Sequence, residues 1–288
     1  MHLDMNFIVR KNLDGEYVII HANQLKEGVE YAVKMGVTQV QIRGVLGSDD
    51  IGMTIDFRQF EKLSKKLKVI SFTDKIDSII NFDFIYSLNR LEKIFFQKKQ
   101  SFTMDVSLFP ALKYLGFEYW KGVSNINLSR SLESLVVYKF NEPNLKDFLG
   151  LSKLNALHIY DSKISDLSDI ESLSIKELYL VKNNCLKEVG VISRMNSLRK
   201  LYIEKCRGVT DFSFLIGNKT IEDLFLSDVD SFCFIPSMRN LNSLRFWSLE
   251  DGDLSFLLQS PTLKIVDFHP QRKNYTHKKE EINILINT

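Results

Sequence analysis

A short hydrophobic phrase recurs along the chain. It consists of an apolar residue, two variable residues, an apolar residue, one variable residue and a third apolar residue, as in Leu154, Leu157 and Ile159. The phrase begins at Val37, Leu67, Leu91, Leu112, Leu132, Leu154, Ile175, Leu198, Ile221, Leu244 and Leu263. From Leu67 onward the copies start 19 to 24 residues apart, a regularity that chance clustering of apolar residues would not produce.

Each copy of the phrase predicts one β-strand followed by a short segment that leads back to the start of the next strand. Two apolar residues flank a single outward residue, which is the period of a β-strand. Apolar residues then follow every three positions, as at Leu186, Val189 and Ile192, and this spacing suits a short helical or 3₁₀ segment. One repeat cannot bury its apolar face alone, so stacked repeats are required. The expected fold is therefore α/β: a leucine-rich repeat solenoid with a parallel sheet on its concave face and a short helical or irregular convex side.

The segment LSKLNALHIYDSKISDLSDIESLS at residues 151–174 and its copies give the chain a family resemblance. Residues 67–268 resemble the short leucine-rich repeat class of bacterial internalin-like proteins, which implies a solenoid that presents a recognition surface. That class places asparagine at the third position after the strand. Asn183 matches this pattern, whereas the other copies hold Trp120, Phe140, Ser162, Cys206, Val229 and Gly252. The departures predict irregular loops.

Both ends of the chain differ from the middle, as capping units do. Residues 7–20 read as a β-hairpin with Asp14 and Gly15 in its turn. Residues 21–35 follow as an amphipathic helix that stops at Gly36. This hairpin and helix would cover the exposed end of the first repeat.

The longer first step leaves room for an extra helix over residues 56–67, whose phenylalanines and leucines fall on one helical stripe. No linker rich in proline, glycine or serine divides the chain. We therefore expect one continuous domain with three parts: a cap at 1–36, the solenoid at 37–268 and a capping tail at 269–288.

Composition narrows the class of protein. The chain has 38 basic and 36 acidic residues, and this balance argues against a dedicated nucleic-acid or membrane-surface protein. The first residues lack a charged segment followed by an apolar core, and no apolar run reaches the roughly 18 residues that span a bilayer. The three cysteines, Cys185, Cys206 and Cys233, form no Cys-x-x-Cys pair. We expect a cytoplasmic, bacterial protein with structural cysteines.

Signatures of catalysis are absent from the sequence. It has no phosphate-binding loop, no nucleophile elbow and no His-Glu-x-x-His motif. His158, Tyr160 and Asp161 lie close together, but a histidine that faces solvent or a partner explains this trio better than catalysis does. The glycines at 44–50 lack the lysine of a phosphate loop. The sequence therefore predicts no enzyme, no cofactor and no metal.

The outward strand residues define the expected binding surface. The central column reads Phe95, Gly116, Val136, His158, Tyr179, Tyr202, Phe225, Ser248 and Asp267. The next column reads Gln97, Glu118, Tyr138, Tyr160, Val181, Glu204, Ser227, Glu250 and His269. Contiguous aromatic residues are typical of protein interfaces, although the rings could also pack on one another. The candidate partner-binding residues are Phe95, Tyr119, Tyr138, His158, Tyr160, Tyr179, Lys182, Tyr202, Lys205, Phe225, Asp228, Phe246, Glu250 and Asp251.

Charge is uneven along this surface. The two repeats that begin at Ile175 and Leu198 are basic, with Lys176, Lys182, Arg199, Lys200 and Lys205. The later repeats are acidic, with Glu222, Asp223, Asp228, Glu250, Asp251 and Asp267. Such a run of charge is often no more than a solvated face. The functional alternative is that the acidic third meets a basic protein partner, because complementary charge raises association rates.

The function that best fits these features is a non-enzymatic module that binds a protein, and the sharpest form of it is an immunity protein that neutralises a toxin with a basic domain. One alternative is a scaffold or regulatory subunit that positions an enzyme. A second is an enzyme with an unrecognised site within residues 43–67. Direct nucleic-acid binding is disfavoured, because acidic residues interrupt the basic repeats. The oligomeric state is left open by the sequence.

Overall fold

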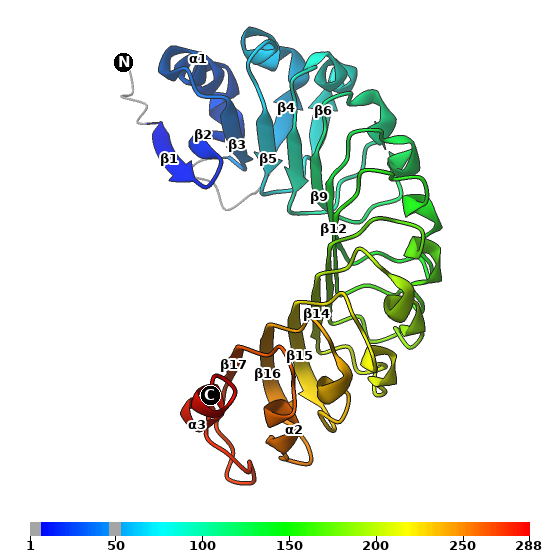
Figure 1. Ribbon diagram of the computed structural model, residues 1–288. Coiled ribbons are helices and arrows are strands. Elements are labelled where there is room, and N and C mark those ends of the chain that lie inside the picture. The colour runs from blue at the N-terminus through cyan, green and yellow to red at the C-terminus, as the bar shows by residue number, and fades with distance from the viewer. Residues whose placement is uncertain (1–6, 46–52) are drawn as a thin grey trace. The chain divides into compact units, whose positions relative to one another are not determined.

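The computed structural model describes residues 7–45 and 53–288, and it divides into two compact units, Met1–Leu135 and Val136–Thr288. Each unit is built from repeats of one strand and one 3₁₀ turn, and Figure 1 shows the strands side by side with the helical turns on the opposite side of each repeat. The predicted leucine-rich repeat solenoid is therefore confirmed. The predicted division at residues 36 and 268 stays a prediction.

The first unit begins with the hairpin and helix that the sequence predicts. Strands β1 (Ile8–Asn12) and β2 (Gly15–His21) pair antiparallel. Helix α1 (Leu25–Met35) then ends at Gly36, whose φ of 69° is left-handed. A Cβ on Gly28 would lie 2.4 Å from Ile20 Cγ2, so only glycine allows the helix to pack this closely on β2.

Parallel strands continue the first unit in the order β2-β3-β5-β7-β9. The further strands are β3 (Gln39–Arg43), β5 (Val69–Phe72), β7 (Lys93–Phe96) and β9 (Tyr114–Glu118), with short outer pairs formed by β4 (Thr54–Asp56) with β6 (Ser78–Ile80) and by β8 (Met104–Asp105) with β10 (Val123–Ser124). The turns are η1 (Ala22–Gln24), η2 (Phe57–Leu63), η3 (Phe82–Ser87), η4 (Val106–Leu108) and η5 (Ile126–Leu128).

The extra helix predicted over residues 56–67 is the 3₁₀ helix η2. Phe57, Phe60 and Leu63 have no exposed surface. Their three-residue spacing matches the three residues per turn of a 3₁₀ helix, so each turn adds one side chain to the core. The buried stripe was therefore predicted correctly, but the helix is tighter than an α-helix.

Strand β11 (Ser134–Tyr138) spans the boundary between the units, and the second unit continues with parallel strands in chain order. They are β12 (Ala156–Tyr160), β13 (Glu177–Val181), β14 (Lys200–Glu204), β15 (Asp223–Val229), β16 (Ser243–Leu249) and β17 (Ile265–Phe268). The returns are η6 (Lys146–Phe148), η7 (Ser168–Ile170), η8 (Gly190–Arg194), η9 (Ser213–Leu215), η10 (Ile235–Ser237) and α2 (Ser255–Leu258), and α3 (Lys279–Leu285) follows the last strand.

The strand register of the second unit brings equivalent residues together. Leu157, Leu178, Leu201, Leu224, Leu244 and Val266 are paired from strand to strand and are at most 1% exposed. This ladder corrects one predicted repeat. Leu244 pairs with Leu224, the middle residue of its phrase, so the copy in β16 begins at Leu241 and not at Leu244.

Polar side chains in the interior link successive repeats of the second unit. The Asn183 side chain accepts a hydrogen bond from the Ser162 amide and donates one to the Ile159 carbonyl, both at 2.9 Å. The Ser162 hydroxyl accepts from the Phe140 amide, and the Cys206 thiol donates to the Leu180 carbonyl. Serine and cysteine thus take over part of the role of asparagine in satisfying buried backbone groups.

Helix α3 covers the free edge of β17. The Asn283 side chain accepts a hydrogen bond from the Val266 amide at 2.9 Å and donates to the Val266 carbonyl at 2.7 Å. The Asn287 side chain donates to the Lys264 carbonyl at 3.0 Å. These side-chain amides satisfy backbone groups that would otherwise form an open strand edge. Within the described ranges, none of the helices has the length and apolar character that crossing a membrane requires.

Candidate protein-binding surface

A row of stacked rings rises from the sheet of the second unit. Ring centroids lie 4.3 Å apart for His158 and Tyr179, 4.7 Å for Tyr179 and Tyr202, and 4.1 Å for Tyr202 and Phe225. The two latter pairs are nearly parallel, with interplanar angles of 10° and 11°. Because these residues are in register on successive strands, the distance between strands sets the stacking distance.

Further aromatic contacts lie at the two ends of this column. Tyr138 and Tyr160 stack at 4.7 Å near the β12 end. Near the other end, Trp247 of β16 meets Phe225 edge-on at 5.3 Å and is 36% exposed. We call Tyr138, His158, Tyr160, Tyr179, Tyr202, Phe225 and Trp247 the aromatic row. Most of its members are half-buried, so the rings pack on one another and still leave part of their surface exposed to solvent.

Polar partners fix the rings of the row. The Tyr202 hydroxyl donates to Glu204 Oε2 at 2.8 Å, and burial together with this carboxylate raises the pKa of Tyr202. Burial alone raises the pKa of Tyr138. His158 Nε2 lies 3.0 Å from Glu177 Oε1, and burial lowers the pKa of His158 although Glu177 opposes the shift. The histidine is therefore mainly neutral near pH 7.

Charged residues line both sides of the row and pair with each other. Lys200 Nζ lies 5.2 Å from the Tyr179 ring centroid and 3.9 Å from Glu177. A side-chain hydrogen bond to Tyr179, with help from the Glu177 charge, raises the pKa of Lys200. Arg245 lies 3.4 Å from Asp223. The row is thus held in place by contacts on every strand from β12 to β16.

The corrected register of β16 changes which residues face outward. Arg245, and not Ser248, is aligned with Phe225 in the central column. The predicted partner-binding residue Phe246 is wrong, because its side chain points into the core and is 1% exposed. Its neighbour Trp247 is the exposed aromatic residue of this strand, although it was not among the predicted partner-binding residues. The two overlapping apolar triplets in LNSLRFWSL were the signal that could have revealed it.

Two other predicted residues lie in the first unit. Phe95 faces outward from β7, and its ring lies so close to Gly116 that a Cβ there would be 2.5 Å from Phe95 Cδ2. Tyr119 is half-buried just after β9. Because the aromatic row belongs to the second unit, Phe95 and Tyr119 are not part of it.

The predicted charge asymmetry is partly neutralised within the protein. Glu222 lies 3.5 Å from Arg199, and Lys279 lies 2.9 Å from Asp267. Exposed carboxylates remain at the carboxyl ends of β15 and β16: Asp228 near the end of β15, Asp230 directly after it, and Glu250 and Asp251 directly after β16. The acidic character of this unit is therefore concentrated at the carboxyl ends of its last strands.

The predicted residues Lys182 and Lys205 follow β13 and β14 directly. Both adopt left-handed backbone conformations, with φ of 57° and 51°. Their amides donate to the Glu204 carbonyl and the Ser227 hydroxyl of the next repeat. The Lys205 Nζ lies over the Trp247 ring, 5.2 Å from its centroid.

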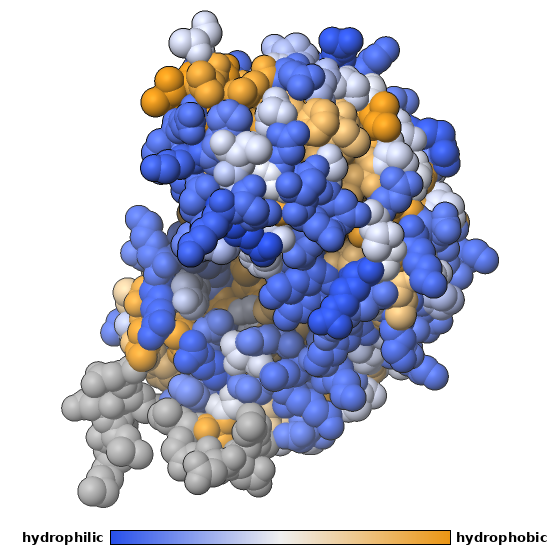
Figure 2. Space-filling view, turned by 90° about the horizontal axis from the view of Figure 1, so that it is seen from below, coloured by the Kyte–Doolittle hydropathy of each residue, from blue (hydrophilic) through white to orange (hydrophobic). Residues whose placement is uncertain are grey.

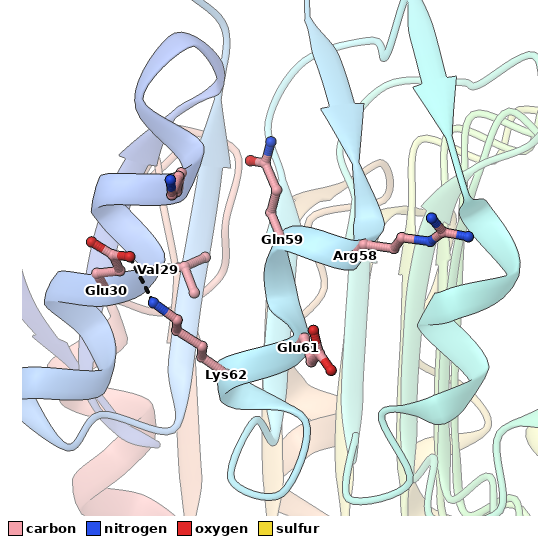
Figure 3. A pocket seen from close by; sticks show the side chains of 7 residues that line it. Val29, Glu30, Arg58, Gln59, Glu61 and Lys62 are labelled. Atoms are coloured by element: carbon pink, nitrogen blue, oxygen red, sulfur yellow. Dashed lines mark hydrogen bonds and ion pairs between the residues drawn. The ribbon is translucent and has the colours of Figure 1, made fainter.

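A pocket of about 220 Å³ lies in the first unit between α1 and η2 (Figure 3). Val29 lies at its apolar base, and Glu30 and Lys62 form a 2.7 Å ion pair across it. That pair holds the pKa of Glu30 below its ordinary value. This pocket overlaps the segment 43–67 proposed as an alternative enzyme site, of which residues 46–52 lie outside the described residues. An exposed ion pair of this kind gives no activated nucleophile or base.

The rest of the described surface offers no metal-binding group: no cluster of three or more His, Cys, Asp or Glu residues is arranged to hold an ion. The face in Figure 2 is mostly hydrophilic, with separate hydrophobic patches. What the site provides is thus a fixed, mixed aromatic and charged surface.

Comparison with known proteins gives similarity to solved structures only. No protein-family model and no curated protein matches the chain. An internalin (inlF) from Listeria monocytogenes is 17% identical with a TM-score of 0.49, covering 89% of this chain and 78% of that chain. An internalin C2 (inlC2) from the same species is 14% identical with a TM-score of 0.42, covering 85% and 92%. The functional domain of its InlJ, which includes a cysteine ladder, is 14% identical with a TM-score of 0.40, covering 88% and 68%.

Proposed function

We propose that this chain is a non-enzymatic protein-binding module and that the aromatic row is its contact surface. The observation that supports this most directly is the uninterrupted stack from His158 to Phe225 with the exposed Trp247 beside it. Tyrosine and tryptophan dominate binding hot spots because they bury a large area. A leucine-rich repeat solenoid supplies the extended surface that such recognition needs.

Preorganisation is the physical advantage of this surface. Each ring is already held by its neighbours, and Tyr202 and His158 are further fixed by carboxylates. Little side-chain entropy remains to be lost when a partner binds, and the cost of ordering normally reduces affinity. Self-packing of the rings and partner binding are therefore compatible.

The test is capture of a partner from a lysate of the source organism, with the parent protein and a Trp247→Ala variant as baits. Trp247 lies at the end of the row, so its loss should leave the other stacks intact. The Leu128→Ala variant is the matched control, because Leu128 is 52% exposed but lies in the first unit. We expect capture by the parent and control and at least tenfold weaker capture by Trp247→Ala, corresponding to about 1.4 kcal/mol. Equal capture by all three would refute the assignment of the row.

A finer proposal concerns the consequence of binding. The exposed carboxylates at the carboxyl ends of β15 and β16 favour a basic partner, and we propose that the chain neutralises a toxin of this kind in the cytoplasm. The three free thiols are consistent with a reducing compartment. An activity assay of the captured partner with and without the chain tests this proposal. Inhibition would support an immunity role, whereas unchanged activity would favour the scaffold alternative.

A further inference from the structure

A groove runs between two neighbouring loops of the second unit. One wall is the loop from β14 to η9, and the other is the loop from β15 to η10. Two adjoining pockets of about 360 and 230 Å³ share Thr210, Phe212 and Asp230 in their linings, so they form one continuous depression. The groove starts near the sheet at Ser227 and reaches Cys233 at its far end.

The floor of this groove is apolar. Val209 and Phe212 lie along it with 7% and 9% of their surface exposed. Ile216, at the far end, is 59% exposed. An apolar floor of this kind gains free energy by covering a hydrophobic side chain, which a purely charged surface would not do.

The rim of the groove carries excess negative charge. Asp211, Asp228 and Asp230 are exposed around it. The Ser227 hydroxyl donates to Asp228 Oδ2 at 2.7 Å and fixes that carboxylate at the edge. The Asp251 amide donates to the Asp230 carbonyl at 3.1 Å, which brings the exposed carboxylates of the next repeat to the same edge.

Two cations oppose these carboxylates. Lys205 and Arg207 are the two cations in the groove lining. The Lys205 ammonium group is directed toward the Trp247 ring. Among the described residues, neither forms an ion pair within 4.0 Å with the rim carboxylates. The carboxylates therefore keep their capacity to pair with an incoming cation, and charge-assisted hydrogen bonds of this type are strong.

We infer that this groove binds an extended segment of the protein partner in which hydrophobic side chains are flanked by basic residues. The hydrophobic side chains cover Val209 and Phe212, and the basic side chains pair with Asp228 and Asp230. This inference rests on the proposed protein-binding function and gives the partner a chemical character. The groove adjoins the aromatic row at Trp247, because Lys205 lies over the Trp247 ring and also lines the groove.

The cysteines of the chain provide a direct test. Cys233 is exposed and lines the groove, whereas the exposed Cys185 does not line it, and Cys206 is buried. Modification of each thiol by a small reagent is followed by mass spectrometry. The probes are a short peptide of lysines and arginines around a central leucine-phenylalanine pair, the same peptide with a central glycine-serine pair, and the first peptide with glutamates in place of its basic residues.

We expect only the basic peptide with the apolar centre to protect Cys233, with no change at Cys185. At ten times the dissociation constant, modification of Cys233 should slow about tenfold. Asp230→Lys should abolish this protection, while the matched Glu188→Lys change should not. Thr210→Trp, which fills the groove, should slow modification of Cys233 without any peptide.

Three results would overturn the inference: no protection at millimolar peptide, equal protection by the acidic or the glycine-serine peptide, or equal protection of Cys185. A Tyr179→Ser variant separates this inference from the proposed role of the aromatic row. If the basic peptide still protects Cys233 in this variant, the groove is supported. That conclusion holds even if the variant captures a partner as well as the parent does, a result that would refute the role of the aromatic row. Loss of protection in a folded Tyr179→Ser protein would contradict a groove that binds its segment by itself.

Discussion

The side-chain amide of Asn283 should be a measurable source of stability for the last repeat. We consider Asn283→Leu, which keeps a side chain of similar size but removes both hydrogen bonds to Val266. Each such bond contributes about 0.5–1.5 kcal/mol net, so losing both should cost roughly 2 kcal/mol. The matched change is Asn287→Leu, which removes exposed bonds to the Lys264 and Asn283 carbonyls and leaves the Val266 bonds in place; because these groups stay accessible to water, it should cost under about 1 kcal/mol.

The comparison between the two variants removes a confounding effect. Each asparagine also donates to the carbonyl four residues before it, that of Lys279 or that of Asn283, so both variants lose a bond of this kind. Asn283 lies inside α3 and Asn287 follows the helix, so leucine gains helix propensity only at position 283, by less than about 0.7 kcal/mol. The difference between the variants therefore gives a lower bound for the Val266 bonds. Because repeat arrays lose structure from their ends, the global free energy of unfolding would underestimate a local effect.

Hydrogen exchange of the Val266 amide measures the local effect directly. A loss of about 2 kcal/mol corresponds to roughly 30-fold faster exchange through local opening. We expect this acceleration in Asn283→Leu and a much smaller one in Asn287→Leu. Equal exchange rates in the parent and in Asn283→Leu would show that α3 does not protect the edge of β17 through this side chain.

Three further outcomes follow from the second unit. Burial lowers the pKa of His158 below its unfolded value, so the free energy of unfolding of the parent should decrease as the pH falls below about 6.5. In His158→Gln, urea titrations at several pH values should show a smaller decrease. An equal decrease in the parent and the variant would contradict the buried histidine. Lys182→Asn should raise the stability by about 0.5–1 kcal/mol, because asparagine tolerates a left-handed backbone; Lys176→Asn, measured by the same thermal unfolding, is the control, and equal shifts would argue against strain. Asn183→Leu should cost about 2–4 kcal/mol by leaving two buried backbone groups unpaired, and a denaturant midpoint equal to that of the parent would contradict the inner polar ladder.

The repeat architecture could be predicted because its signal is repeated many times. Period-two alternation around each strand and three-residue steps after it define the inward residues, and these are buried as expected. The hairpin turn at Asp14 and Gly15 and the helix stop at Gly36 were equally clear, since each depends on local backbone chemistry.

The register of β16 could not be predicted with the same certainty. Leu241, Leu244 and Phe246 fit the hydrophobic phrase, and Leu244, Trp247 and Leu249 fit it equally well. Only pairing with Leu224 on β15 distinguishes the two readings, and pairing is a non-local property. The error exchanged an exposed tryptophan for a buried phenylalanine in the expected site.

The groove between the loops that follow β14 and β15 could not be predicted from the sequence, for a related reason. Asp228 was recognised as a candidate, but the apolar floor under it comes from a different loop, at Val209 and Phe212. Loop conformations that depart from a strict repeat carry no periodic signal. The sequence therefore identified charges correctly without showing which apolar groups lie between them.

Because the two tryptophans lie in different units, tryptophan fluorescence can follow the unfolding of each unit separately. Trp120 is buried in the first unit, where its Nε1 donates to the Phe102 carbonyl at 2.6 Å. Trp247 lies at the surface of the second unit beside Lys205. Replacing either one leaves a single fluorophore that follows one unit alone. Coincident unfolding curves from the two single-tryptophan proteins would mean that the units melt cooperatively, and separate curves would make each unit an independent folding element.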